Sequence, residues 1–192
     1  MAVTRVSFVA AAQAPEPGEW IIERVSARRG ESLAPAAALG RIEAPELLAP
    51  AGAVWTLHGV RSHERYLERA EKNQLAAVQE GLGRSDSRRA VLIPMSKSAA
   101  WWDLAQDERR ALFENRSRHI EIGSAYLPAI ARRLYHARDL GGPFDFLTWF
   151  EFEPAHAEMF EELVGMLRAT EEWNYVEREV DIRVERERLD AG

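Results

Sequence analysis

The sequence predicts an α+β fold in which antiparallel sheets pack together with helices on the outside. Three observations support this fold class. The second half of the chain contains, in order, a strand, a helix, two strands, a helix and a strand. Apolar residues make up 46% of the chain and charged residues 29%, as in ordinary globular proteins. The length of 192 residues suffices for one large domain or for two small ones that share a core.

Alternating and continuous apolar patterns locate the elements of the second half. We expect strands at about 90–95, 129–138, 145–152 and 175–184. Asp103, with Gln106 three residues on, predicts the N-cap of a helix that extends to about His119. Pro154 begins a second helix, whose apolar face carries Met159, Phe160, Leu163, Val164 and Leu167. This order is that of the ferredoxin-like unit, a four-stranded antiparallel sheet with both helices on one face.

The first half is a reduced version of the same plan. Strands are expected at 20–27 and 54–62 and a helix at 66–79, whereas the Ala- and Pro-rich segment 33–52 favours a loop. The opening segment resembles a signal peptide only loosely, because Ser7 interrupts a short apolar core, and it favours a strand and a cytoplasmic protein. We therefore expect two ferredoxin-like halves, 1–88 and 89–192, with their sheets packed together.

Composition excludes several classes of function. A net charge of −6 argues against a general nucleic-acid or membrane-surface binder. The absence of cysteine excludes disulfides, iron–sulfur clusters and thiolate nucleophiles, so a metal or haem would need His, Tyr, Met or carboxylate ligands. No apolar run approaches the ~20 residues that a membrane-spanning helix needs.

The five histidines give no zinc motif, because no two have i, i+4 spacing and no HExxH occurs. His119 stands out because it ends a predicted helix, one turn beyond Asn115 and two beyond Leu112. From the residues alone it is either a surface or core histidine or a ligand. The other four are His58, His63, His136 and His156.

An arginine and a tryptophan pair are the other unusual features. Arg132 shares the face of a predicted strand with Ile130 and Leu134, so it needs an anionic partner, either an internal carboxylate or a bound anion. Trp101 and Trp102 lie just before the His119 helix, where they either pack the core or wall a flat ligand.

A long ordered series of segments carries a family resemblance. The segments IPMSKSAAWWDLAQDERR, RHI, ARRLYH, DFLTWFEF and TEEWNYVEREVDIR resemble the chlorite dismutase family, a group of haem b enzymes. Upstream, WTLHGVRSHERY and VQEGLGR look like the short, dimeric branch with a reduced N-terminal domain. The resemblance implies a dimeric α+β barrel type of fold, one haem b per chain and a homodimer.

On the proximal side of the haem, the resemblance assigns His119 as the iron ligand. Glu172 matches the carboxylate that hydrogen-bonds the imidazole, and the adjacent Glu171 is the alternative if the register shifts by one. Such a carboxylate fixes the tautomer of a metal-bound histidine and adds electron density to the metal. The surrounding proximal network is matched by Lys97, Trp101 and Trp102.

On the distal side, Arg132 matches the family's arginine, Thr148 a small polar residue and Gln79 a glutamine that holds that arginine. Leu127 and Leu147 are expected to line an apolar distal wall. The implied activity is that of a chlorite O2-lyase, which converts chlorite to chloride and molecular oxygen. In this interpretation His119 and Glu172 favour cleavage of the O–Cl bond, and Arg132 attracts chlorite and retains the hypochlorite fragment. A coproheme decarboxylase, a small-substrate haem peroxidase and a non-catalytic haem-binding protein remain as alternatives.

Overall fold

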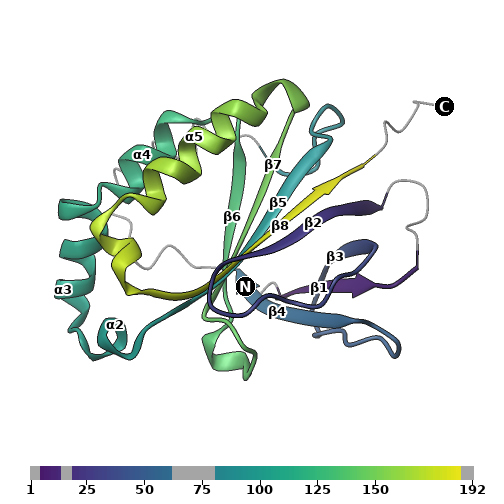
Figure 1. Ribbon diagram of the computed structural model, residues 1–192, viewed down its shortest axis with the longest axis horizontal. Coiled ribbons are helices and arrows are strands. Elements are labelled where there is room, and N and C mark those ends of the chain that lie inside the picture. The colour runs from purple at the N-terminus through teal and green to yellow at the C-terminus, as the bar shows by residue number, and fades with distance from the viewer. Residues whose placement is uncertain (1–4, 14–18, 62–80, 187–192) are drawn as a thin grey trace.

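The computed structural model describes residues 5–13, 19–61 and 81–186 of the chain. Within these residues, antiparallel strands close into one barrel in the order β1-β3-β2-β8-β5-β7-β6-β4 (Figure 1). The strands are β1 (Arg5–Ala11), β2 (Trp20–Arg29), β3 (Ala38–Ala44), β4 (Trp55–Arg61), β5 (Arg89–Lys97), β6 (Ala131–His136), β7 (Phe146–Phe152) and β8 (Val176–Glu185).

The barrel consists of two sets of four strands that share one internal order. The first set runs β4-β1-β3-β2 and the second β8-β5-β7-β6. Numbered by their order in the chain, the strands of each set therefore have the same spatial order, 4-1-3-2. This agrees with two ferredoxin-like halves, although the boundary between 88 and 89 stays a prediction. The inner faces of the two sheets pack on each other in the barrel interior, where Phe8 contacts Tyr135 and Trp149. The sheets also join edge to edge at the β2–β8 and β4–β6 pairs, which closes the barrel.

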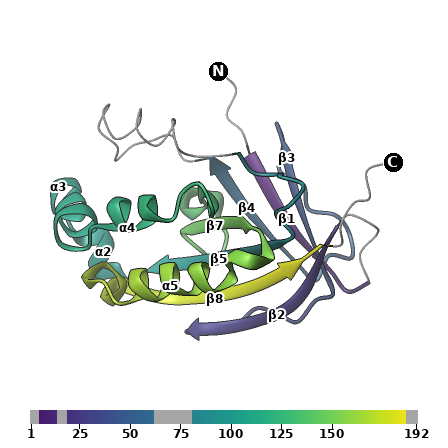
Figure 2. The same ribbon diagram turned by 90° about the horizontal axis from the view of Figure 1, so that it is seen from above.

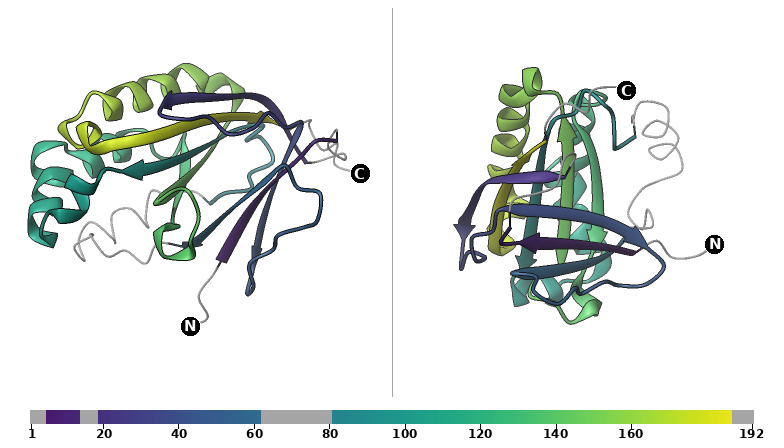
Figure 3. Two further views of the ribbon diagram at one scale, coloured as in Figure 1. Left: turned by 60° about the horizontal axis from the view of Figure 1, so that its bottom comes forward. Right: turned by 90° about the vertical axis from the view of Figure 1, so that its right-hand side faces the viewer.

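The described helices all belong to the second half. They are α2 (Ala99–Asp103), α3 (Gln106–Arg110), a π-helical turn (Ala111–Arg116), α4 (His119–Ala125) and α5 (Ala157–Arg168), with 3-10 turns at Arg138–Leu140, Pro154–His156 and Glu171–Tyr175. Helices α4 and α5 run alongside the strands of this half, whereas α2 and α3 lie beyond the strand ends (Figure 2). Between β3 and β4, residues 45–54 form no helix, although a complete ferredoxin-like unit has one at this place. The strands of the first half lie at the end of the barrel away from the helices (Figure 3).

Two apolar cores follow from the alternation of side chains along the strands. In β5, Ala90 and Leu92 face the barrel interior, whereas Val91 and Ile93 face the helices. Because both faces are covered, the strand is apolar almost throughout, as the sequence predicts. The candidate functional residues His119, Arg132 and Thr148 lie in the layer between the strands and the helices.

Three element predictions were wrong in detail. The segment 33–52 contains β3, since pairing with β1 along its whole length outweighs the weak strand propensity of Ala and Gly. Asp103 ends α2 instead of capping the next helix; α3 begins after Ala105, whose N–H donates to Glu108 Oε2 at 2.7 Å. Met159 is 37% exposed, so the buried face of α5 is narrower than expected.

Other expectations agree with the structure or fall outside it. The N-terminal strand is confirmed as β1, whereas the helix expected at 66–79 lies outside the described residues. No helix among the described residues is both long and apolar enough to cross a membrane.

Candidate functional site

His119 is the first residue of α4, not the last residue of the preceding helix as the sequence suggests. The π-helical turn Ala111–Arg116 ends just before it, and Arg118 adopts a left-handed conformation with φ of 50°. This interruption starts a new helix at His119, and the ring of Phe113 stacks on the imidazole at 4.3 Å between centroids. Arginine rarely adopts this left-handed conformation, so the sequence gives no signal of the break.

The imidazole belongs to a row of hydrogen-bonded polar groups. His119 Nδ1 lies 2.8 Å from Glu172 Oε2, and the other carboxylate oxygen, Oε1, accepts a hydrogen bond from Lys97 Nζ at 2.7 Å. Lys97 ends β5 and pairs with Val176, which brings it beside the 3-10 turn that carries Glu172. Ser117 Oγ accepts a hydrogen bond from the Glu172 N–H at 2.9 Å and so ties this turn to the segment before His119.

The ionisation of these groups is set by burial and by their mutual charges. Burial raises the pKa of Glu172, but His119 and Lys97 outweigh it and bring the pKa down from 4.5 to about 2. Burial lowers the pKa of Lys97, while the negative charge of Glu172 opposes that shift. Glu172 is therefore ionised at neutral pH and can only accept hydrogen bonds, so the proton between the two groups belongs to His119 Nδ1.

The structure distinguishes the two neighbouring glutamates. Glu171 points to the exposed side of the turn, where it pairs with Arg116 at 3.0 Å. Glu172 is 4% exposed and contacts the histidine. Between the two carboxylates that the sequence left open, Glu172 is the one beside His119.

Trp101 and Trp102 have different partners near the His119, Glu172 and Lys97 side chains. Trp101 is buried, and Lys97 Nζ lies 4.5 Å from the centre of its ring. The Trp102 Nε1–H donates to Asp145 Oδ2 at 3.2 Å, and the guanidinium of Arg138 stacks over the Trp102 ring at 3.8 Å. Trp101 thus supports the lysine, whereas Trp102 belongs to a cluster at the start of β7.

A pocket between the strands and helices contains both residues on which the functional hypothesis depends. His119 and Arg132 both line it, and Thr148 is a third predicted residue on its wall. Its volume is about 410 Å³, including the part open to solvent. The remaining lining residues are Ile93, Met95, Phe150, Val164, Leu167, Arg168 and Trp173.

One prediction for the distal wall, Leu147, was wrong, whereas Leu127 and Gln79 stay predictions. Leu147 is 1% exposed and faces the barrel interior, because it has the opposite strand parity to Thr148. Leu127 follows α4 and is absent from the pocket wall that the structure describes. Gln79 lies outside the described residues.

Arg132 is half-buried and reaches the pocket from β6. Its guanidinium packs against Gly123 of α4, where a Cβ atom would lie 1.9 Å from Arg132 Nη1. Burial lowers the pKa of Arg132, and the negative charge of Glu114 opposes this shift. Gly123 therefore matters for the placement of Arg132, and sequence reasoning missed it because a single helical glycine carries no pattern.

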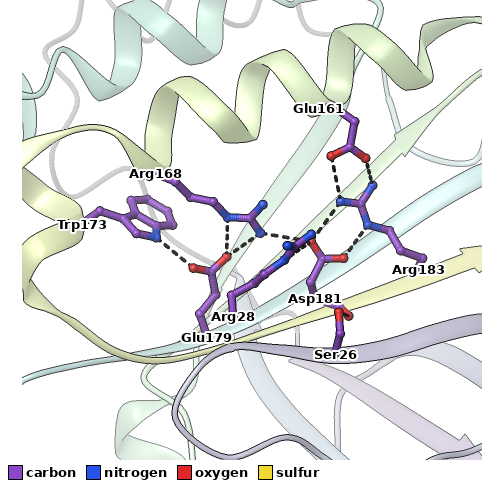
Figure 4. A network of polar contacts seen from close by, with 8 residues as sticks. All are labelled: Ser26, Arg28, Glu161, Arg168, Trp173, Glu179, Asp181 and Arg183. Carbon is purple, nitrogen blue, oxygen red and sulfur yellow. Dashed lines mark hydrogen bonds and ion pairs between the residues drawn. The ribbon is translucent and has the colours of Figure 1, made fainter.

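Sequence reasoning also missed a buried ion-pair network behind the pocket. Glu179 and Asp181 of β8 are almost fully buried and face Arg168 of α5 (Figure 4). Burial raises the pKa of Asp181, but Arg183 and Arg168 outweigh it and hold the pKa below its usual range. The apolar alternation of Val180, Ile182 and Val184 predicts the strand but not the burial of the charged residues between them, which α5 covers with Arg168.

The fold and the pocket together define an α+β barrel protein that carries a carboxylate-bound histidine and an arginine on the walls of one cavity. The chain belongs to the chlorite dismutase family, whose model matches residues 32–187.

Solved structures agree with this membership. A dimeric chlorite dismutase from Nitrobacter winogradskyi is 55% identical, with a TM-score of 0.85 over 95% of this chain and 99% of that one. A chlorite dismutase from Candidatus Nitrospira defluvii, in a mutant form, is 22% identical, with a TM-score of 0.69 over 96% of this chain and 91% of that one. The second likeness concerns the fold alone.

Proposed function

We propose that this protein is a haem b enzyme that converts chlorite to chloride and molecular oxygen. The observation that carries the proposal is the pocket lined by both His119 and Arg132, in a chain of the chlorite dismutase family. The similar Nitrobacter protein is a dimeric chlorite dismutase. We extend its activity and its dimeric state to this chain as proposals.

The residues of the pocket fit a haem group. Because the His119 Nδ1–H donates its hydrogen bond to Glu172, Nε2 carries the free lone pair and is the ring atom that would coordinate the iron. The wall is otherwise largely apolar, as a porphyrin face requires, and the chain has no cysteine that could compete as a ligand. His119 would be the protein ligand of one haem b per chain.

The bound haem iron would supply the redox chemistry that breaks the O–Cl bond. Glu172 holds the imidazole in one tautomer and increases its electron donation. Lys97 neutralises the buried carboxylate and fixes its second oxygen, while Trp101 covers the ammonium. These three residues thus keep the ligand in one orientation.

Arg132 supplies a fixed positive charge and several donors on the same pocket. We assign it the binding of the chlorite anion and the retention of the hypochlorite fragment until the O–O bond forms. Electrostatic retention of this kind is strongest in an apolar cavity, which the lining of Ile93, Phe150 and Val164 provides. Thr148 lies on the same wall as a small polar group.

An absorption titration with haem followed by an oxygen-electrode trace tests the proposal. A five-coordinate haem spectrum and rapid oxygen release from chlorite would support it. Haem binding with peroxide-dependent dye oxidation and no oxygen release would favour a peroxidase instead. A six-coordinate, inactive protein would identify a haem carrier, and loss of propionate carboxyl groups from coproheme would identify a decarboxylase.

A further inference from the structure

A second buried carboxylate, that of Glu179, contacts Trp173, the residue that follows Glu172. The Trp173 Nε1–H donates to Glu179 Oε2 at 2.9 Å, and Glu179 Oε1 accepts from Arg168 Nε at 2.8 Å and from Nη2 at 2.6 Å (Figure 4). Glu179 is 1% exposed. Both of its oxygens are occupied by side chains from different elements, so its orientation is fixed.

Trp173 connects this carboxylate to the histidine site. Its ring is part of the pocket wall and lies 5.5 Å from Lys97 Nζ. It shares the 3-10 turn Glu171–Tyr175 with Glu172, and Arg29 Nη1 donates to the Trp173 carbonyl oxygen at 2.8 Å. Because Glu172 and Trp173 are adjacent in one short turn, a rotation of Trp173 would move the Glu172 carboxylate.

We propose that Glu179 and Arg168 are positioning residues for the His119–Glu172 pair. They hold the indole of Trp173, and through it the turn that carries Glu172, in the orientation that the imidazole hydrogen bond requires. The part of the inference that concerns bound haem rests on the proposed function. Outer partners of metal-bound histidines typically change metal affinity or activity by about 10- to 100-fold when they are removed.

The alternative is that the indole–carboxylate bond serves stability alone. The barrel interior contains a matched case, since the Trp149 Nε1–H donates to Glu151 Oε1 at 2.7 Å. Trp149 and Trp173 are both buried, and both bond a buried glutamate, but Trp149 lies in the barrel core and Trp173 on the pocket wall. Trp149→Phe is therefore the control for losing a buried indole N–H in this protein.

The experiment compares Trp173→Phe and Trp149→Phe with the unsubstituted protein. Imidazole ¹⁵N NMR of the haem-free protein reports the tautomer of His119, and resonance Raman of the ferrous haem-loaded protein reports the iron–histidine stretch. We expect Trp173→Phe to move the His119 ¹⁵N shifts toward a mixture of tautomers and to lower the stretching frequency. Trp149→Phe should change neither, although both variants lower the melting temperature.

Two outcomes would overturn the positioning role. They are unchanged His119 ¹⁵N shifts in Trp173→Phe, or equal changes in the two variants. If the unsubstituted haem-loaded protein shows no iron–histidine band, the proposed function fails, while the haem-free NMR comparison still decides the positioning role. Should Trp173→Phe fail to fold, Glu179→Gln removes the charge that holds Arg168 and keeps an oxygen for the indole. Glu179→Gln should then give the same direction of ¹⁵N shift, and its absence would overturn the inference.

Discussion

The Glu172 carboxylate offers a sharp test of the site, because its charge joins His119 and Lys97. Replacing it by glutamine keeps the shape of the side chain but removes the negative charge between the two groups. Lys97 is 5% exposed, so its ammonium would lose its carboxylate partner in a buried position. Breaking one side of a buried ion pair costs roughly 3–5 kcal/mol of unfolding free energy.

The pH dependence of the unfolding free energy gives a second value for the contribution of the Glu172 charge to stability. The pKa of Glu172 falls from 4.5 to about 2 on folding, which corresponds to about 3 kcal/mol at ~1.4 kcal/mol for each factor of ten. Since the folded pKa is the lower one, this stabilisation is present above about pH 5 and is lost as the pH falls toward 2. At about pH 3 roughly half of it remains.

The assay is urea unfolding of the haem-free protein at several pH values between about 7 and 3. The difference in unfolding free energy between the unsubstituted protein and Glu172→Gln should be about 3 kcal/mol at pH 7 and shrink by about half at pH 3. Glu171→Gln is the control, since Glu171 forms an exposed pair with Arg116 worth less than about 1 kcal/mol. A difference that stays constant with pH, or equal losses in the two variants, would refute the assignment of the buried charge to Glu172.

Three further substitutions test the pocket. Arg132→Ala should keep fold and haem, lower chlorite turnover by about 100-fold and speed the bleaching of the haem absorbance; an unchanged turnover number would contradict its role. His119→Ala should lose most of its haem in an absorption titration, and a normal haem spectrum would show that another residue is the ligand. Gly123→Ala places a methyl group where Arg132 Nη1 lies, so chlorite turnover should fall while the His119 ¹⁵N shifts stay unchanged. Normal turnover in this variant would show that Arg132 does not need that position.

The elements of the fold were predictable where local pattern determines them. The continuous apolar run in β5 and the alternation of Val180, Ile182 and Val184 in β8 each predict a strand, and both strands formed. Closure of the barrel was not predictable, because it depends on pairs such as Val25 with Ile182 that lie far apart in the sequence. β3 was missed for the same reason, since its stability comes from its neighbours and not from its own residues.

For the candidate site, the sequence yields a set of residues but not their geometry. The family resemblance selected His119, Glu172, Lys97 and Arg132, and the structure brings the first three into direct contact. The break before α4 was invisible, because Arg118 adopts a conformation that its residue type does not suggest. The choice between Glu171 and Glu172 required the direction of a 3-10 turn, in which adjacent residues point to different sides.

Two arginines line the pocket, and their surroundings separate their roles. Arg168 donates to Glu179 at 2.6 Å and to Asp181 at 3.0 Å, and both carboxylates are buried. Its positive charge is matched within the protein, so drawing Arg168 toward an incoming anion would leave two buried carboxylates poorly compensated. The Arg132 guanidinium packs on the backbone of Gly123, and the negative charge of Glu114 acts on it. Arg168 therefore fits the holding of the wall, and the anion-binding role proposed for Arg132 rests on its place in the pocket lining.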